Sequence, residues 1–178
     1  MSFLQYLING ISIGSVYAII ALGYTMVYGI AKMLNFAHGD VIMVGAYMSY
    51  SVTSYLGLPT AVGIAVAVVV CTLLGVLIEG LAYKPLRGVP SLAVLITAIG
   101  VSYFLQNAAQ LVWGSAPKNF KSIVTMKPMV LFDGQLTITG EVIYTIAASV
   151  LIMVALTLFI NKSRMGKAMR AVSEDRDA

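Results

Sequence analysis

Long uncharged, apolar runs divide the chain into segments of about the length that crosses a membrane. Residues 1–31, 41–78, 88–117 and 142–161 contain no Asp, Glu, Lys or Arg. A helix rises ~1.5 Å per residue, so about 20 residues cross a hydrocarbon core of ~30 Å. The run 41–78 is too long for one crossing, and Gly57-Leu58-Pro59 within it favours a turn. These patterns predict helices at about 5–28, 41–56, 60–82, 91–113 and 142–160.

A polar stretch that contains glycine, residues 32–40, separates the first two predicted helices. One interpretation is a helix broken at membrane depth, which is tolerated where protein or a water-filled path surrounds the backbone and which often marks a transport site. The other is an ordinary short loop at the membrane surface. Under the first interpretation the candidate pathway residues here are Asn35, His38, Gly39 and Asp40.

Composition narrows the fold class. The 178 residues are 60% hydrophobic and 10% charged, with a mean hydropathy of +0.93, whereas a soluble domain carries ~25% charged residues. This excludes a soluble enzyme, a disordered chain and a small disulfide-stabilised domain. We predict an all-α polytopic transmembrane bundle of about five helices, the second discontinuous in one interpretation, forming a single domain over residues 1–178. A short cytoplasmic amphipathic helix follows the bundle.

The cations lie between the apolar runs, as membrane topology requires, and form no stripe that would bind nucleic acid. Five of the eleven fall in residues 161–178, and Lys84 and Arg87 lie in the 83–90 loop. Cytoplasmic loops are enriched in Lys and Arg, so both segments are predicted to be cytoplasmic. Residues 114–141 then form an external loop with a small hairpin or a short surface helix, and alternation places the N-terminus outside.

Few side chains offer chemistry. The sequence has no phosphate-binding loop, and with one His and one Cys it suggests no metal site, no cofactor and no catalytic residue. A membrane enzyme that uses His38 and Asp40 is the weakest alternative. Gln106 lies on one helical face with Ser102 and Gln110, beside Asn107. This stripe serves interhelical hydrogen bonding or lines a pathway. Glu79 and Arg87 are a candidate structural ion pair.

The basic tail contains an amphipathic pattern. Met165, Ala168, Met169 and Val172 follow helical spacing, with the charged residues largely off that stripe. Such a helix lies on a lipid surface or docks in the groove of a partner, and the stripe alone favours the lipid surface.

Several motifs, in this order and spacing, resemble the N-terminal part of branched-chain amino acid ABC transporter permeases of the LivH type. They are Asn9-Gly10, Gly14-Ser15, Tyr17-Ala18, Ala21-Leu22-Gly23, Asn35-Phe36-Ala37-His38-Gly39-Asp40, Gly45-Ala46-Tyr47, Glu79, Tyr83-Lys84-Pro85-Leu86-Arg87, Thr97, Ile99-Gly100, Gln106-Asn107 and Gly166-Lys167-Ala168-Met169-Arg170-Ala171.

The resemblance implies a multi-pass subunit of a bacterial inner-membrane importer, with no enzymatic activity of its own. Its expected partners are a second similar permease, two cytoplasmic ATPases and a periplasmic amino-acid-binding protein. It also makes residues 161–178 a coupling segment and favours a groove of the ATPase over the lipid surface. The implied coupling residues are Met165, Gly166, Ala168, Met169, Arg170, Ala171 and Glu174.

The sequence is compatible with alternatives in substrate, mechanism and length. Urea and short-amide permeases share much of the pattern, so they are the alternative substrate class. An ATP-independent channel or secondary transporter is the alternative mechanism. Because permeases of this type are longer, we expect the chain to be a fragment or a truncated gene product.

Overall fold

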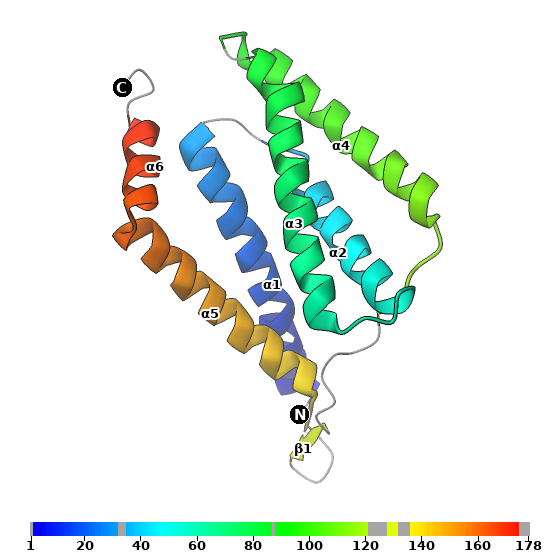
Figure 1. The fold of residues 1–178 in the computed structure, drawn as a ribbon. Coiled ribbons are helices and arrows are strands. Elements are labelled where there is room, and N and C mark those ends of the chain that lie inside the picture. Colours follow the sequence, from blue (N-terminus) through cyan, green and yellow to red (C-terminus); the bar gives the residue numbers. More distant parts are fainter. Residues whose placement is uncertain (1, 32–34, 87, 121–127, 132–135, 175–178) are drawn as a thin grey trace. The chain divides into compact units, whose positions relative to one another are not determined.

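The structure is a computed structural model that describes residues 2–31, 35–86, 88–120, 128–131 and 136–174. The long helices are α1 (Ser2–Ala31), α2 (His38–Ser54), α3 (Thr60–Ile78), α4 (Ser91–Trp113) and α5 (Gly140–Lys162), followed by the shorter α6 (Arg164–Glu174). The all-α class is confirmed, and each predicted helix is present with its ends shifted by a few residues (Figure 1).

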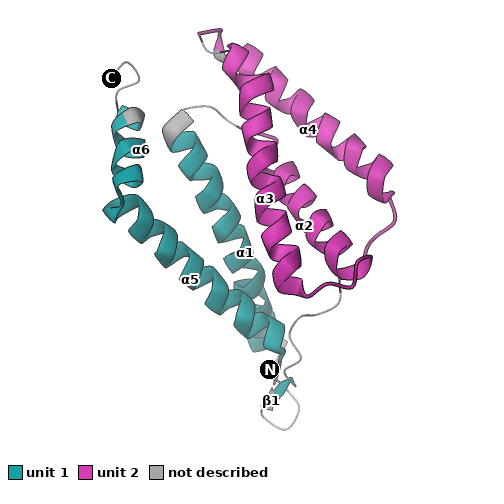
Figure 2. Ribbon diagram, viewed as in Figure 1, with its two compact units in different colours: residues 1–32, 122–178 teal, residues 33–121 magenta. Residues whose placement is uncertain are grey.

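Helix length supports four crossings directly. The spans Phe3–Gly29, Thr60–Leu86, Leu92–Trp113 and Gly140–Lys162 are long and apolar enough to cross a membrane. With 17 residues, α2 is about 26 Å long, slightly short of the hydrocarbon thickness. The chain divides into two compact units, residues 1–32 with 122–178 (unit 1) and residues 33–121 (unit 2) (Figure 2).

In unit 2, α2 and α3 run antiparallel and meet through small residues. A Cβ atom added at Gly45 would lie 2.6 Å from the Cys71 sulfur, and one added at Gly63 would lie 3.1 Å from the carbonyl oxygen of Ser49. Small residues at a spacing of four let helix backbones approach closely, and this contact supplies much of the attraction between helices in lipid. The close pairing of α2 and α3 therefore depends on the absence of a side chain at Gly45 and Gly63.

The coil of α3 continues beyond Ile78 with altered geometry. A π-helical turn covers Glu79–Tyr83, and a 3₁₀ turn covers Lys84–Leu86. The hydrophobic core of unit 2 gathers around this point. Its buried members come from the start of α2, the end of α3 and one face of α4: Ala37, Ile78, Tyr83, Val94, Ala98 and Leu105.

In unit 1, a small hairpin joins the N-terminal ends of two long helices. Strands β1 (Met129–Leu131) and β2 (Leu136–Ile138) pair antiparallel, so residues 114–141 contain the hairpin rather than the short surface helix that was the alternative. The Gln5 carboxamide of α1 donates to the Thr137 carbonyl oxygen (2.9 Å) and accepts from the Thr137 amide (3.0 Å). It thus binds the edge of β2 as another strand would.

Helices α1 and α5 of unit 1 run in the same direction. Their N-terminal ends lie beside the hairpin, and at the other end Met26 and Gly29 of α1 line the same small cavity as Ile160 of α5 (Figure 1). The end of α1 and the end of α5 therefore lie on the same side of unit 1.

The close approach of α2 and α3 gives a first prediction. Gly45→Ala places a methyl group against the short, stiff Cys71 side chain, so we expect it to destabilise the protein by about 1–3 kcal/mol, as overpacking does. Cys71→Ala removes the obstructing sulfur and should recover most of this loss, giving a non-additive double-mutant cycle. The measurement is the unfolding free energy of the full permease in detergent.

The control for this cycle is Gly100→Ala, where an added Cβ meets no atom within 4 Å. Additive effects of Gly45→Ala and Cys71→Ala would contradict the contact.

Candidate functional site

The polar segment before α2 is folded against the end of α3. The Asn35 side-chain oxygen accepts the Ala37 amide at 3.0 Å and the Tyr83 hydroxyl at 2.8 Å, while the Asn35 carbonyl oxygen accepts the His38 amide at 3.2 Å. An Asn that bonds the backbone two residues on forms a local turn, and here the turn starts α2 at His38. Ala37, between them, is fully buried.

Asp40 lies in the first turn of α2 and is buried, with 8% of its surface exposed. Its side chain accepts a hydrogen bond from the Gln106 amide of α4 at 3.0 Å, and Gln106 also donates to the Ser102 hydroxyl at 3.1 Å. A helix N-terminus favours an acidic side chain. Two candidates from separate parts of the sequence, Asp40 and Gln106, are therefore in direct contact.

The other candidates occupy different positions. Asn107 is exposed and donates to the Tyr103 carbonyl oxygen of its own helix at 2.7 Å, so it does not join Asp40. His38 is half-buried and Gly39 is exposed, both in the first turn of α2. Among the described residues, no three His, Cys, Asp or Glu side chains are close enough to hold a metal ion.

Tyr83 also contacts the segment before α2, although the sequence pattern does not mark it as a site residue. Its hydroxyl reaches Asn35 because the π turn shifts the side chains after Glu79 around the helix axis. Glu79 itself is half-buried. Its predicted partner Arg87 lies outside the described residues, so that ion pair stays a prediction.

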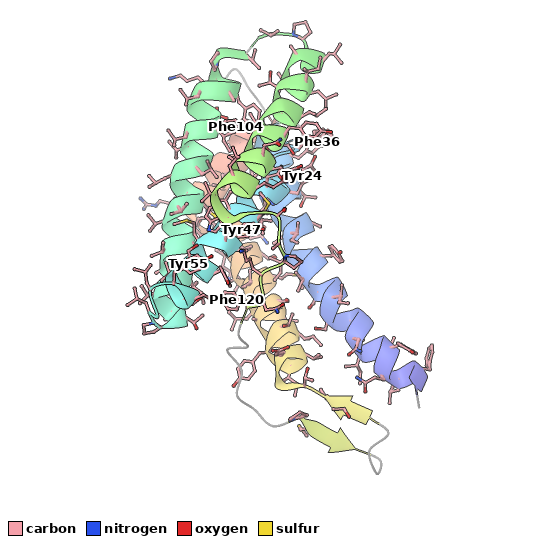
Figure 3. The ribbon with its side chains drawn as sticks, turned by 90° about the vertical axis from the view of Figure 1, so that its right-hand side faces the viewer. Tyr24, Phe36, Tyr47, Tyr55, Phe104 and Phe120 are labelled. Carbon is pink, nitrogen blue, oxygen red and sulfur yellow. The ribbon has the colours of Figure 1, made fainter. Side chains whose placement is uncertain are left out.

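A second contact joins α2 to α4 near their C-terminal ends. The Trp113 indole donates to the Ser51 hydroxyl at 2.8 Å, and its ring stacks on Tyr47 with centroids 4.9 Å apart. Tyr50 packs beside Tyr55 and Phe120, which Figure 3 labels together with Tyr47. Helix α2 is therefore held to α4 by polar contacts at both of its ends.

The candidate coupling segment begins with a one-residue bend. Ser163 has extended backbone angles (φ −78°, ψ 154°) between α5 and α6. Its amide continues α5 by donating to the Phe159 carbonyl oxygen (2.9 Å), and its hydroxyl accepts the Gly166 amide (2.8 Å). Ser163 thus ends one helix and caps the next. The serine before the amphipathic run is the signal that could have revealed this.

The predicted stripe of α6 is divided between two faces. Gly166 is buried and Met169 is half-buried beside a cavity of about 150 Å³, which Met26 and Ile160 also line. Arg170 lines the same cavity. Met165, Ala168, Arg170, Ala171 and Glu174 are exposed, although Arg170 also binds Asn161, and the side chain of Val172 lies outside the described residues.

These features define a polytopic helical membrane protein with polar contacts around the start of α2 and a short amphipathic helix after α5. Residues 6–178 match the family described as "Branched-chain amino acid transport system / permease component", and the chain belongs to this family. No solved structure matches it.

The relatives include the high-affinity branched-chain amino acid transport system permease proteins BraD of Pseudomonas aeruginosa and LivH of Escherichia coli K12. BraD is 42% identical over 97% of this chain and 60% of its own length, and LivH is 43% identical over 97% and 59%. A probable LivH of Methanocaldococcus jannaschii is 26% identical over 88% and 50%. The chain thus spans about three-fifths of the bacterial relatives, which are transporter components by name.

The contact between Asp40 and Gln106 gives a second prediction. Gln106→Leu leaves a buried acceptor without its donor, so it should lower the free energy of unfolding by about 1–3 kcal/mol. Asp40→Asn keeps an acceptor oxygen and should cost less than Asp40→Leu. Thermal unfolding of the purified full permease measures both effects.

The matched control is Asn107→Leu, one residue along α4, whose amide donates to the Tyr103 carbonyl oxygen of its own helix. Equal stability losses at positions 106 and 107 would show that the Asp40–Gln106 contact contributes little.

Proposed function

We propose that this chain is part of a permease subunit of an ABC importer that moves branched-chain amino acids across the bacterial inner membrane. The observation that carries the proposal is its similarity, along almost the whole chain, to permeases named for this transport. The importer would also contain a second permease, two cytoplasmic ATPases and a periplasmic binding protein. ATP chemistry would belong to the ATPases, because the sequence contains no phosphate-binding loop.

The exposed face of α6 supports the coupling role. Met165 is 62% exposed, and Ala168 lies on the same side of the helix. An exposed apolar helical face fits a groove in another protein. In this proposal, closure of the ATPases displaces α6, and the helices connected to it alternate access to the path.

The polar contacts around the start of α2 support the pathway role. The Tyr83 hydroxyl binds Asn35 just before α2, and Gln106 of α4 binds the buried Asp40 carboxyl group in the first turn of α2. Ionisable groups at such positions in membrane proteins usually mark a route for a polar substrate or bind a partner group within the bundle. The contact between Asp40 and Gln106 would change if α2 moved against α4.

The direction of the helices in unit 1 also bears on topology. Because α1 and α5 run the same way, the end of α1 and the start of α5 belong to opposite membrane surfaces. Between them, α3 and α4 are long enough to cross once each, which returns the chain to its starting surface. We therefore infer that the segment containing α2 supplies a fifth crossing, with the N-terminus and residues 114–141 on one side.

Cysteine labelling tests this topology in a Cys71→Ala background of the full permease. Leu58 and Val89 are partly exposed, at 44% and 42%. Leu58→Cys should react with an impermeant maleimide in spheroplasts, as should Ser115→Cys on the external side. Val89→Cys should react only after permeabilisation. Protection of Leu58→Cys in spheroplasts would contradict a crossing by α2.

An uptake assay tests the function. The full permease, assembled with its ATPases and binding protein, should take up labelled leucine, and depletion of ATP should stop uptake. Met165→Glu should reduce both ATPase co-purification and uptake, because an unpaired charge would be buried in the partner groove. If the substitution lowers the binding free energy between α6 and the ATPase by at least about 1.4 kcal/mol, the affinity falls by at least about tenfold.

Lys162→Gln, at an exposed position before the bend, is the matched control. Uptake of urea in place of leucine would reassign the substrate class. Uptake that survives ATP depletion and follows an ion gradient would replace the importer with a secondary transporter.

A further inference from the structure

The bend between α5 and α6 is held by contacts on one face of α6. They involve Ser163, Gly166 and Arg170, at spacings of three and four residues, so all three lie toward the last turn of α5. Each is a different kind of contact: a cap, a backbone approach and a side-chain hydrogen bond.

The backbone approach at Gly166 is the tightest. A Cβ atom there would lie 2.2 Å from the Ile160 carbonyl oxygen and 2.6 Å from the Ile160 Cα. Both obstructing atoms belong to the backbone of a helix, so they cannot turn aside as a flexible side chain can. Any side chain at position 166 would force α6 away from α5.

The other two contacts stabilise the bend on either side of Gly166. The Ser163 hydroxyl binds the Gly166 amide, and the Lys167 amide binds the Ser163 carbonyl oxygen at 3.1 Å. One turn further on, the Arg170 guanidinium donates to the Asn161 side-chain oxygen. The linker is a single residue whose amide, carbonyl oxygen and hydroxyl are all bonded, which leaves little freedom for a hinge.

We infer that residues 159–170 form a rigid elbow in which Ser163, Gly166 and the Asn161–Arg170 pair are positioning residues that make α5 and α6 move as one body. This rests on the proposed coupling role of α6. When a partner displaces α6, α5 then tilts with it, because the angle between the two helices does not change. Gly166 and Arg170 act through this geometry, whereas Met165 and Ala168 contact the partner.

A distance measurement tests the rigidity by itself. Nitroxide labels at Leu151 of α5 and Lys167 of α6, both exposed, are placed in the full permease in the Cys71→Ala background. We expect a narrow distance distribution that is the same in the nucleotide-free and ATP-trapped complexes. A distribution that shifts between these states, or that is broad in the wild type, overturns the inference.

Variants test what the elbow does. Gly166→Ala should broaden the distribution and lower the leucine transported per ATP hydrolysed by about two- to thirtyfold, while assembly with the ATPases persists. A role confined to folding would lower the yield of complex and leave this ratio unchanged. If Gly166→Ala does not assemble, Ser163→Ala removes only the cap and should lower the ratio in the same direction.

Ser163→Thr keeps the hydroxyl, and Gly100→Ala adds the same methyl group in open space, so both should behave as the wild type. An unchanged ratio in Gly166→Ala and Ser163→Ala overturns the positioning role. If no ATPase co-purifies with the wild type, the proposed function fails and the positioning role with it. A narrow distance distribution between the two labels in the permease alone would then support the rigid bend without a coupling role.

Discussion

Hydrocarbon offers no hydrogen-bond partner, and the protein's polar groups inside a membrane must therefore be satisfied by the protein itself. This constraint explains where the described polar side chains lie. The Asp40 carboxyl group meets the Gln106 amide, the Asn35 side chain meets the Tyr83 hydroxyl, and the Trp113 indole meets the Ser51 hydroxyl. Each pair therefore joins α2, or the turn just before it, to α4 or to the π turn after α3.

Close packing complements these polar contacts. Apolar side chains gain little by leaving lipid for another helix, because both environments are equally apolar. Attraction between α2 and α3 therefore requires many contacts at short range, which Gly45 and Gly63 permit by having no side chain. Together, the glycine contacts and the polar pairs hold α2, the shortest of the long helices, between α3 and α4.

The sequence predicts the helices well because each is set by local properties. Uncharged runs give their number, and Gly57 and Pro59 separate α2 from α3. For residues 114–141 the sequence left a hairpin and a short surface helix open, and the structure has the hairpin. The contacts between these elements are harder to predict from the sequence, since they depend on how each helix is rotated about its axis. Gln106 and Asn107 are equivalent in the sequence, yet a rotation of about 100° per residue places only Gln106 against Asp40.

The contact of Tyr83 is also hard to predict from the sequence, here because of the π turn. Nothing in residues 60–83 marks the π turn, and an uninterrupted α-helix would direct Tyr83 elsewhere. Its bond to Asn35 links residues 48 positions apart. Such a contact becomes predictable only when both the helix register and the turn before α2 are known. The sequence therefore names Asn35, Asp40 and Gln106 as candidates but does not show which side chain each one contacts.

The tail illustrates how one pattern can serve two contacts. The apolar stripe alone favours a lipid surface, whereas the resemblance to LivH-type permeases implies that the motif from Gly166 to Ala171 contacts a partner. In the structure, Gly166 and Met169 turn toward α1 and α5, and Arg170 binds Asn161. Part of the motif is thus required by the bend, whatever the partner is. A partner can use only the residues that the bend leaves exposed, and this restricts its contact to the side of α6 that carries Met165 and Ala168.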